Sequence, residues 1–188
     1  SNDETYYYEF FPSNKLELGL WLESERMLHP VIDEIGVKTQ NEVVKEEKRL
    51  SYDNRPYGQL LPQITQSLFK KHPYRWLPIG SMDHLDSATL DEFIAYNKKF
   101  YVPNNAVLVV AGNFEIDETK NKIKDYFGPI PRGNDVPRID IEEDPLTAEV
   151  RKSFYDPNIQ LPMGLVCYRI PSFKERDGYV LDMISSIL

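Results

Sequence analysis

Cysteine is almost absent from this chain: Cys167 is the only one among 188 residues. A lone cysteine excludes an internal disulfide framework and any metal site built from clustered cysteines. Long hydrophobic runs are missing too, because stretches such as 106–111 fall far short of the roughly 18 apolar residues that a membrane-spanning helix needs. The sequence therefore predicts neither a disulfide-stabilised protein nor a membrane span.

Basic charge is also in short supply. Lysine and arginine number 22 against 30 aspartates and glutamates, which gives a formal net charge of -8. Proteins that bind nucleic acid normally carry a basic stripe, so this balance argues against a nucleic-acid partner. Hydrophobic residues make up 41% of the chain, which is enough to build a core. The composition predicts one folded domain, or one domain plus part of another.

Apolar residues recur at helical spacing in several stretches, and proline and capping residues punctuate them. Asn14 and Glu17 have the spacing of a capping box at the start of the first helix. The helix before Pro73 is expected to stop short of His72, because the residue preceding proline is pushed out of the helical region. The helices expected are 14–28, 34–52, 59–71, 87–101, 115–127 and a final one from about residue 175, with a loop over 74–86.

Four other stretches have the composition of strands. The run 105–112 is almost continuously apolar, which predicts a strand buried on both faces. Cys167 lies in another, where it is expected to act as a small core residue. The remaining expected strands are 5–11 and 148–155, and the one that holds Cys167 is 163–170. Strands mixed with long helices, without regular alternation, predict an α+β fold.

Glu47 interrupts the apolar stripe of the helix expected at 34–52. Val43 and Leu50 lie on that stripe, and Glu47 occupies the position between them where a leucine would be expected. A buried carboxylate needs a cation or several hydrogen-bond donors. A metal, a histidine or a buried arginine would serve, whereas a slightly rotated helix would leave Glu47 paired with an arginine at the surface. Spacing alone leaves both interpretations open.

The chain carries none of the other common signatures of a catalytic site. The histidines, His29, His72 and His84, do not form a His-x-x-Glu-His or His-Glu-x-x-His pair, so they do not predict a zinc site by themselves. There is no glycine-rich phosphate loop, and no serine has the flanking glycines of a nucleophile elbow.

Residues 40–58, with Val43-Val44, Glu47 and Arg55-Pro56-Tyr57-Gly58, resemble the helix that carries the third zinc ligand in the pitrilysin/insulinase family of zinc peptidases. This family of inverted zincins includes mitochondrial processing peptidase. The similarity continues through 72–74, 101–113 and 161–171, so that it covers nearly the whole chain. The order and spacing of these segments carry the resemblance.

The resemblance implies a site for catalytic zinc. The carboxylate that follows Val-Val-x-x is the metal ligand in that family, and Glu47 stands there in this sequence. Seven residues earlier the family usually has a glutamate that orients a zinc-bound histidine, and here the residue is Gln40. The His-x-x-Glu-His motif, which supplies two ligands and the general base, is absent from the 188 residues. The chain alone is therefore expected to be inactive.

The resemblance also implies an architecture and partners. It predicts an internal fragment, truncated at both ends, of a soluble, bacterial-type zinc metalloendopeptidase, periplasmic or cytoplasmic. Its α+β metallohydrolase-like domain would pack helices on an antiparallel-rich mixed sheet. The substrate would be a peptide or unfolded polypeptide, and a second homologous domain or subunit would close a chamber around it. The expected divisions are 1–127, the partial first half with the third-ligand helix; 128–147, an acidic, proline-containing linker; and 148–188, the next strand–helix repeat.

Two alternatives compete with a peptidase. One is a non-catalytic structural or partner subunit of the same family, which Gln40 favours and Glu47 disfavours. The other sets the resemblance aside and treats the chain as an α+β interaction module, in which Glu47 is exposed and paired with a lysine or arginine.

Overall fold

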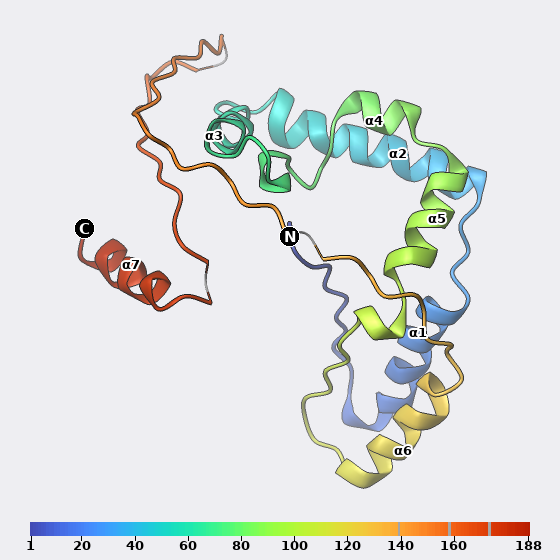
Figure 1. Cartoon of the computed structure of the whole chain (residues 1–188). Coiled ribbons are helices and arrows are strands. Elements are labelled where there is room, and N and C mark those ends of the chain that lie inside the picture. The colour runs from blue at the N-terminus through green and yellow to red at the C-terminus, as the bar shows by residue number, and fades with distance from the viewer. Residues whose placement is uncertain (139, 158, 173) are drawn as a thin grey trace. The chain divides into compact units, whose positions relative to one another are not determined.

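The computed structural model describes residues 1–138, 140–157, 159–172 and 174–188 (Figure 1). Within these ranges every regular element is a helix, and none of the helices is long and apolar enough to cross a membrane. Short 3-10 turns at 13–15, 73–75 and 103–105 accompany them. The helices are α1 (Leu16–Leu28), α2 (Glu34–Lys48), the π-helix η2 (Arg49–Asp53), α3 (Leu60–Leu68), α4 (Met82–Ser87), α5 (Leu90–Phe100), α6 (Ile116–Phe127) and α7 (Arg176–Ile187).

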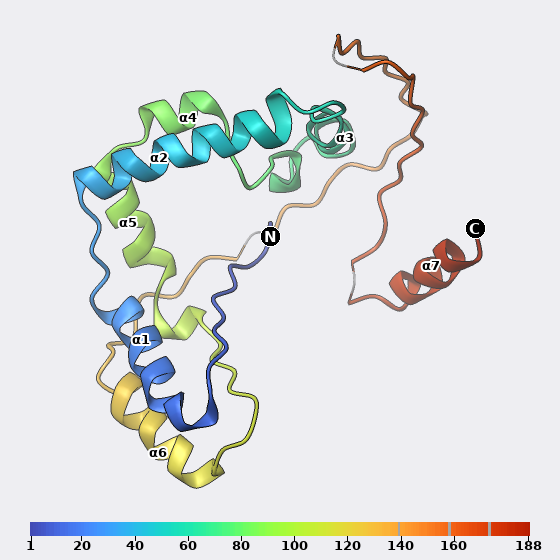
Figure 2. The ribbon, with the colours of Figure 1, turned by 180° about the vertical axis from the view of Figure 1, so that it is seen from behind.

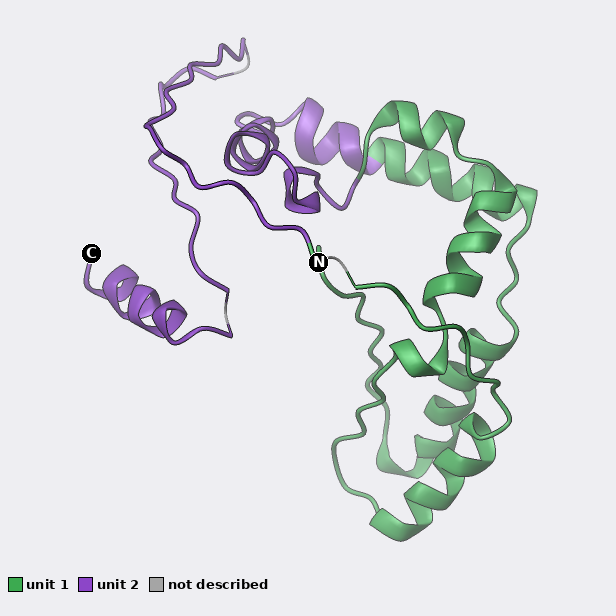
Figure 3. Ribbon diagram, viewed as in Figure 1, with its two compact units in different colours: residues 1–46, 80–140 green, residues 47–79, 141–188 purple. Residues whose placement is uncertain are grey.

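Backbone contacts divide the chain into two compact units (Figure 3). Unit 1 comprises residues 1–46 and 80–140, and unit 2 comprises residues 47–79 and 141–188. Ile139 of the expected linker, and Asn158 and Phe173 of the expected last segment, lie outside the described residues.

Unit 1 is built on the contact of α1 with α6, which lie side by side in both Figure 1 and Figure 2. Leu20 on α1 is only 3% exposed and Thr119 on α6 only 4%. The ring of Phe11 lies so close to Gly19 that a β-carbon at that position would collide with it. Glu17 completes the contact, since it accepts a hydrogen bond from the Tyr126 hydroxyl at 2.9 Å.

The expected helices are confirmed, although several of their ends differ from expectation. The capping box at Asn14 and Glu17 is wrong, because no side chain caps α1 and Glu17 bonds to α6 instead. The helix expected at 87–101 begins later, at Leu90, where Thr89 and Glu92 form a full capping box. The segment expected to be a loop, 74–86, contains most of α4, which Ser81 caps through the His84 N–H.

The expected α+β fold with an antiparallel-rich mixed sheet is wrong, because the described ranges contain helices and no strands. The four stretches expected as strands form no hydrogen-bonded ladder with another segment among the described residues. Val107 and Val109, expected to be buried on both faces, are 89% and 78% exposed, and Cys167 is exposed as well. An apolar run encodes a tendency to be buried, but a strand also needs a second backbone to receive its hydrogen bonds.

Little apolar surface is buried. Among the described residues only two hydrophobic side chains, Leu20 and Val102, are buried. Stability in unit 1 therefore depends on a small number of contacts, above all the one between α1 and α6.

The α1–α6 contact can be tested with Leu20→Ala. Removing this buried side chain should lower the free energy of unfolding by about 2–4 kcal/mol, because the lost apolar contacts leave a cavity. Urea titration followed by helical circular dichroism measures the change. Leu18→Ala, on the same helix but 49% exposed, is the matched control and should change the midpoint far less. Equal effects of the two substitutions would contradict the assignment of Leu20 to the core.

Candidate functional site

Helix α2 presents the residues that the sequence singled out. Asp33 begins the helix, since its carboxylate accepts a hydrogen bond from the Gly36 N–H at 2.6 Å. The helix runs from Glu34 to Lys48 and carries both Gln40 and Glu47. Residues seven apart lie on nearly the same face of an α-helix, about 10 Å apart along its axis. Gln40 and Glu47 therefore face the same way without contacting each other.

Glu47 is exposed, and among the described residues its carboxylate has no hydrogen bond or ion pair. The apolar stripe around it is open as well, with Val43 53% and Leu50 64% exposed. Neither interpretation of the spacing therefore describes the carboxylate, because it is neither buried nor paired with a surface arginine. It lies on an open apolar face, available to a ligand.

The two lysines that flank Glu47 are engaged by other carboxylates. Lys45 contacts Asp86 at 2.6 Å and Glu42 at 2.7 Å, and these hydrogen bonds raise the pKa of its ammonium group. Lys48 contacts Asp53 at 3.0 Å. Because each ammonium group already has an anionic partner, neither neutralises Glu47.

A π-helical turn, Arg49–Asp53, follows α2 directly and begins two residues after Glu47. The Asn54 N–H closes it by donating to the Arg49 carbonyl at 2.8 Å, and the Lys48–Asp53 ion pair spans the same five-residue interval. Single π turns are rare and occur often at functional sites. The sequence analysis predicted ordinary helix to residue 52 and missed this turn, because the apolar periodicity does not distinguish the two helix types.

The described residues do not bring together the donors that catalytic zinc needs. In the part of the chain that the structure describes, no three His, Cys, Asp or Glu side chains come close enough to hold a metal ion. His29 contacts Glu25 at 2.8 Å, and the Nδ1 atom of His72 accepts a hydrogen bond from the Tyr74 N–H at 3.2 Å. Catalytic zinc normally takes three protein ligands, so the described residues do not form such a site by themselves.

An aromatic groove in unit 1, with a volume of about 750 Å³, was not predicted from the sequence. Tyr7, Tyr96 and Tyr101 line it together with Arg26 and His29. The Tyr7 hydroxyl donates a hydrogen bond to that of Tyr101 at 3.2 Å, and this bond, with burial, raises the pKa of Tyr7 to about 12. With its pKa raised in this way, the Tyr7 hydroxyl stays protonated at neutral pH.

Part of the chain matches a model of a known protein family. The family model described as "Peptidase M16 inactive domain" matches residues 87–188, which is more than half of the chain. The match begins downstream of α2, so Gln40 and Glu47 lie outside it.

Similar proteins are named as zinc proteases. Zinc protease PqqE of Helicobacter pylori is 27% identical over 190 residues, a match covering 100% of this chain and 43% of that protein. An uncharacterized zinc protease of Mycobacterium leprae is 27% identical over 128 residues, covering 68% of this chain and 28% of that protein. The crystal structure of a protease from Helicobacter pylori superposes with a TM-score of 0.68 and 27% identity, covering 71% of this chain and 33% of that one. The chain spans less than half the length of these proteins.

Because Glu47 is exposed, we expect its substitution to change the stability of the chain very little. Glu47→Gln should change the free energy of unfolding by less than about 0.5 kcal/mol, because the carboxylate has no partner among the described residues to lose. Lys45→Met should lower the urea midpoint more, since it removes ion pairs to both Glu42 and Asp86. A large loss of stability in Glu47→Gln would show that the carboxylate has a structural partner.

Proposed function

This chain belongs to the peptidase M16 family, and we propose that it works as part of a zinc-dependent metalloendopeptidase that hydrolyses peptide bonds. Relatives named zinc proteases match 68–100% of the chain in the cases above, which supports the proposal. The observation that carries it is the carboxylate of Glu47, exposed on α2 with both flanking lysines engaged elsewhere.

In this proposal Glu47 supplies one zinc ligand. A carboxylate that meets a metal must be ionised and accessible, and it must not already be held by another cation. Glu47 is exposed and has no cationic partner among the described residues. The π turn that follows it supports a functional role, because such turns cost regular helix geometry.

Gln40 takes the role of an orienting residue. It lies two turns before Glu47 on the same helix, and its amide oxygen can accept a hydrogen bond from an imidazole that binds the metal. It would hold the ring in position without adding negative charge. Zinc, when bound, supplies a Lewis acid that activates water. The remaining ligands and the general base come from a His-x-x-Glu-His segment, which the 188 residues do not contain.

The open apolar faces suit the assembly proposed for the longer protein. Val43, Leu50, Val107 and Val109 are all more than half exposed, and apolar surface of this kind is covered where domains or subunits meet. A second homologous domain or subunit would close a chamber around a peptide or unfolded substrate. We retain the division into 1–127, 128–147 and 148–188 as part of this proposal.

A non-catalytic partner subunit is the second candidate. The match of residues 87–188 to a domain described as inactive favours it, as does the incomplete set of metal donors in the described ranges. The two candidates differ in what Glu47 does in the longer protein, because a partner subunit has no need of a carboxylate there.

Glu47→Gln in the full-length protein decides between them. We expect zinc content to fall well below one equivalent and peptide hydrolysis to drop by at least about 100-fold, because the amide is a much weaker metal ligand than a carboxylate. Zinc is measured by elemental analysis after dialysis, and hydrolysis with a quenched fluorescent peptide. A near-neutral effect on thermal stability should accompany both losses.

Glu46→Gln is the matched control. It removes the same charge one residue away but about 100° around the helix, and should leave both zinc content and hydrolysis near the wild-type values. Full zinc binding and activity in Glu47→Gln would refute the assignment of Glu47, whereas a full-length wild type without zinc or activity would favour the partner subunit.

The 188-residue chain alone should neither retain stoichiometric zinc nor cleave peptides, because it provides too few ligands and lacks the motif glutamate. The same dialysis and peptide assays measure this. Stoichiometric zinc or cleavage by the isolated chain would contradict the prediction.

A further inference from the structure

Three consecutive main-chain N–H groups follow α3 and have no helical acceptor. The last backbone hydrogen bond of the helix end is donated by Phe69 to Thr65, and Pro73 then starts a new turn. The N–H groups of Lys70, Lys71 and His72 lie between these two points. Successive N–H groups that point to one spot form a concave anion-binding feature.

The carboxylate of Glu143 fills this feature. Its Oε1 atom accepts hydrogen bonds from the N–H groups of Lys70 at 2.7 Å, His72 at 2.6 Å, and Lys71. The side chain of Glu143 is only 10% exposed, in contrast to the neighbouring Glu142, which is exposed. One carboxylate oxygen thus satisfies three main-chain donors more than 70 residues away in the sequence.

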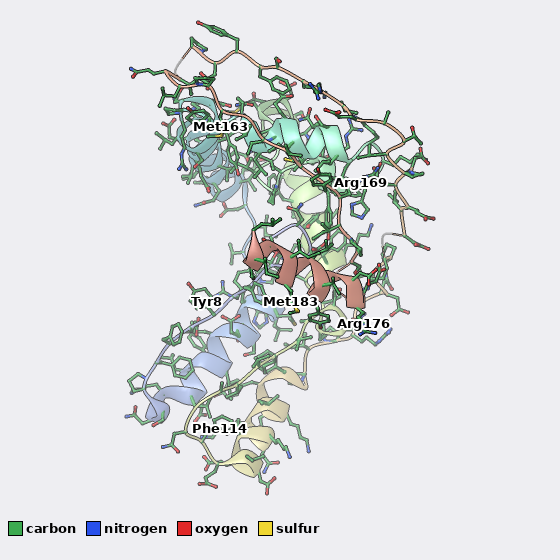
Figure 4. The ribbon with its side chains drawn as sticks, turned by 90° about the vertical axis from the view of Figure 1, so that its left-hand side faces the viewer. Tyr8, Phe114, Met163, Arg169, Arg176 and Met183 are labelled. Atoms are coloured by element: carbon green, nitrogen blue, oxygen red, sulfur yellow. The ribbon has the colours of Figure 1, made fainter. Side chains whose placement is uncertain are left out.

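Arg169, which lies on the run before α7 (Figure 4), contacts the same site. Its guanidinium lies 3.9 Å from Oε2 of Glu143 and donates a hydrogen bond to the carbonyl of Asp144 at 2.6 Å. The Lys71 ammonium contacts the Asp144 carboxylate at 2.6 Å. The site therefore joins residues 70–72, 143–144 and 169, all within unit 2.

We infer that residues 70–72 and Arg169 form a carboxylate-binding site that Glu143 fills from the same chain, and that this latch attaches the segment beginning at residue 141 to the end of α3. A charge-assisted hydrogen bond is stronger than a neutral one, and here three converge on one oxygen. Farther along the same segment, the Tyr57 hydroxyl donates a hydrogen bond to the Leu161 carbonyl at 2.6 Å. The latch needs no zinc, so it stands apart from the proposed peptidase function.

The ionisation of Glu143 agrees with this role. Burial alone raises the pKa of its carboxyl group, but the hydrogen bonds from the three N–H groups and the charge of Arg169 outweigh burial and hold the pKa below the ordinary value. The carboxylate is accordingly charged at neutral pH, as a latch built on main-chain donors requires.

Amide hydrogen exchange tests the latch residue by residue. In the wild-type chain, the amides of Lys70, Lys71 and His72 should exchange slowly, although they lie outside any helix. Glu143→Ala should accelerate their exchange by about tenfold or more, because the acceptor is gone. Glu143→Gln should give an intermediate rate, since it keeps an acceptor oxygen without the charge. The measurement is made by NMR at constant pH.

Glu142→Ala is the matched control, because it removes the adjacent exposed carboxylate and should leave the three exchange rates unchanged. Amides inside α3, which lies in unit 2 like the latch, report whether a variant stays folded there, and their rates should be the same in all proteins. Unprotected amides at 70–72 in the wild type, or protection that persists in Glu143→Ala while α3 remains folded, would overturn the inference.

Discussion

Main-chain N–H and C=O groups need hydrogen-bond partners, and this requirement governs the structure of the chain. Within each helix most of these groups pair with one another, and side chains such as Thr89 and Ser81 accept hydrogen bonds from the first turn. The extended stretches cannot meet it alone, and the described part of the chain offers them no paired backbone. Just after α3, the same requirement is met by a side chain, because the Glu143 carboxylate accepts hydrogen bonds from three N–H groups that follow the helix.

Two glutamates show how differently the chain uses the same side chain. Glu143 is almost covered, and its charge is balanced by main-chain donors and Arg169, so it contributes to how unit 2 holds together. Glu47 is exposed on an apolar face, and the nearby lysines contact other carboxylates. A carboxylate without a partner among the described residues is a natural candidate for a ligand to a metal ion, which is the basis of the role proposed for Glu47.

Much of the candidate site could be found from the sequence, and the reasons are local. A glutamate that interrupts an apolar stripe can be read from spacing alone, and the resemblance to zinc peptidases added Gln40 two turns earlier. The π turn after Glu47 was not predicted, because residues 49–53 keep the apolar periodicity of an ordinary helix. The latch at Glu143 was not predicted either. Its donors are main-chain groups, which carry no sequence signature, and its partners are about 70 residues apart in the sequence.

The sequence by itself determined the helices and several of their ends, because helical hydrogen bonds connect residues four apart and the Pro73 break acts on its immediate neighbour. It also determined the family resemblance, which the match over 87–188 bears out. The tertiary structure determined whether the apolar runs are buried. Residues 105–112 have the composition of a buried strand, yet Val107 and Val109 are exposed. Composition records that a segment prefers burial, but only another segment brought alongside can bury it and receive its hydrogen bonds.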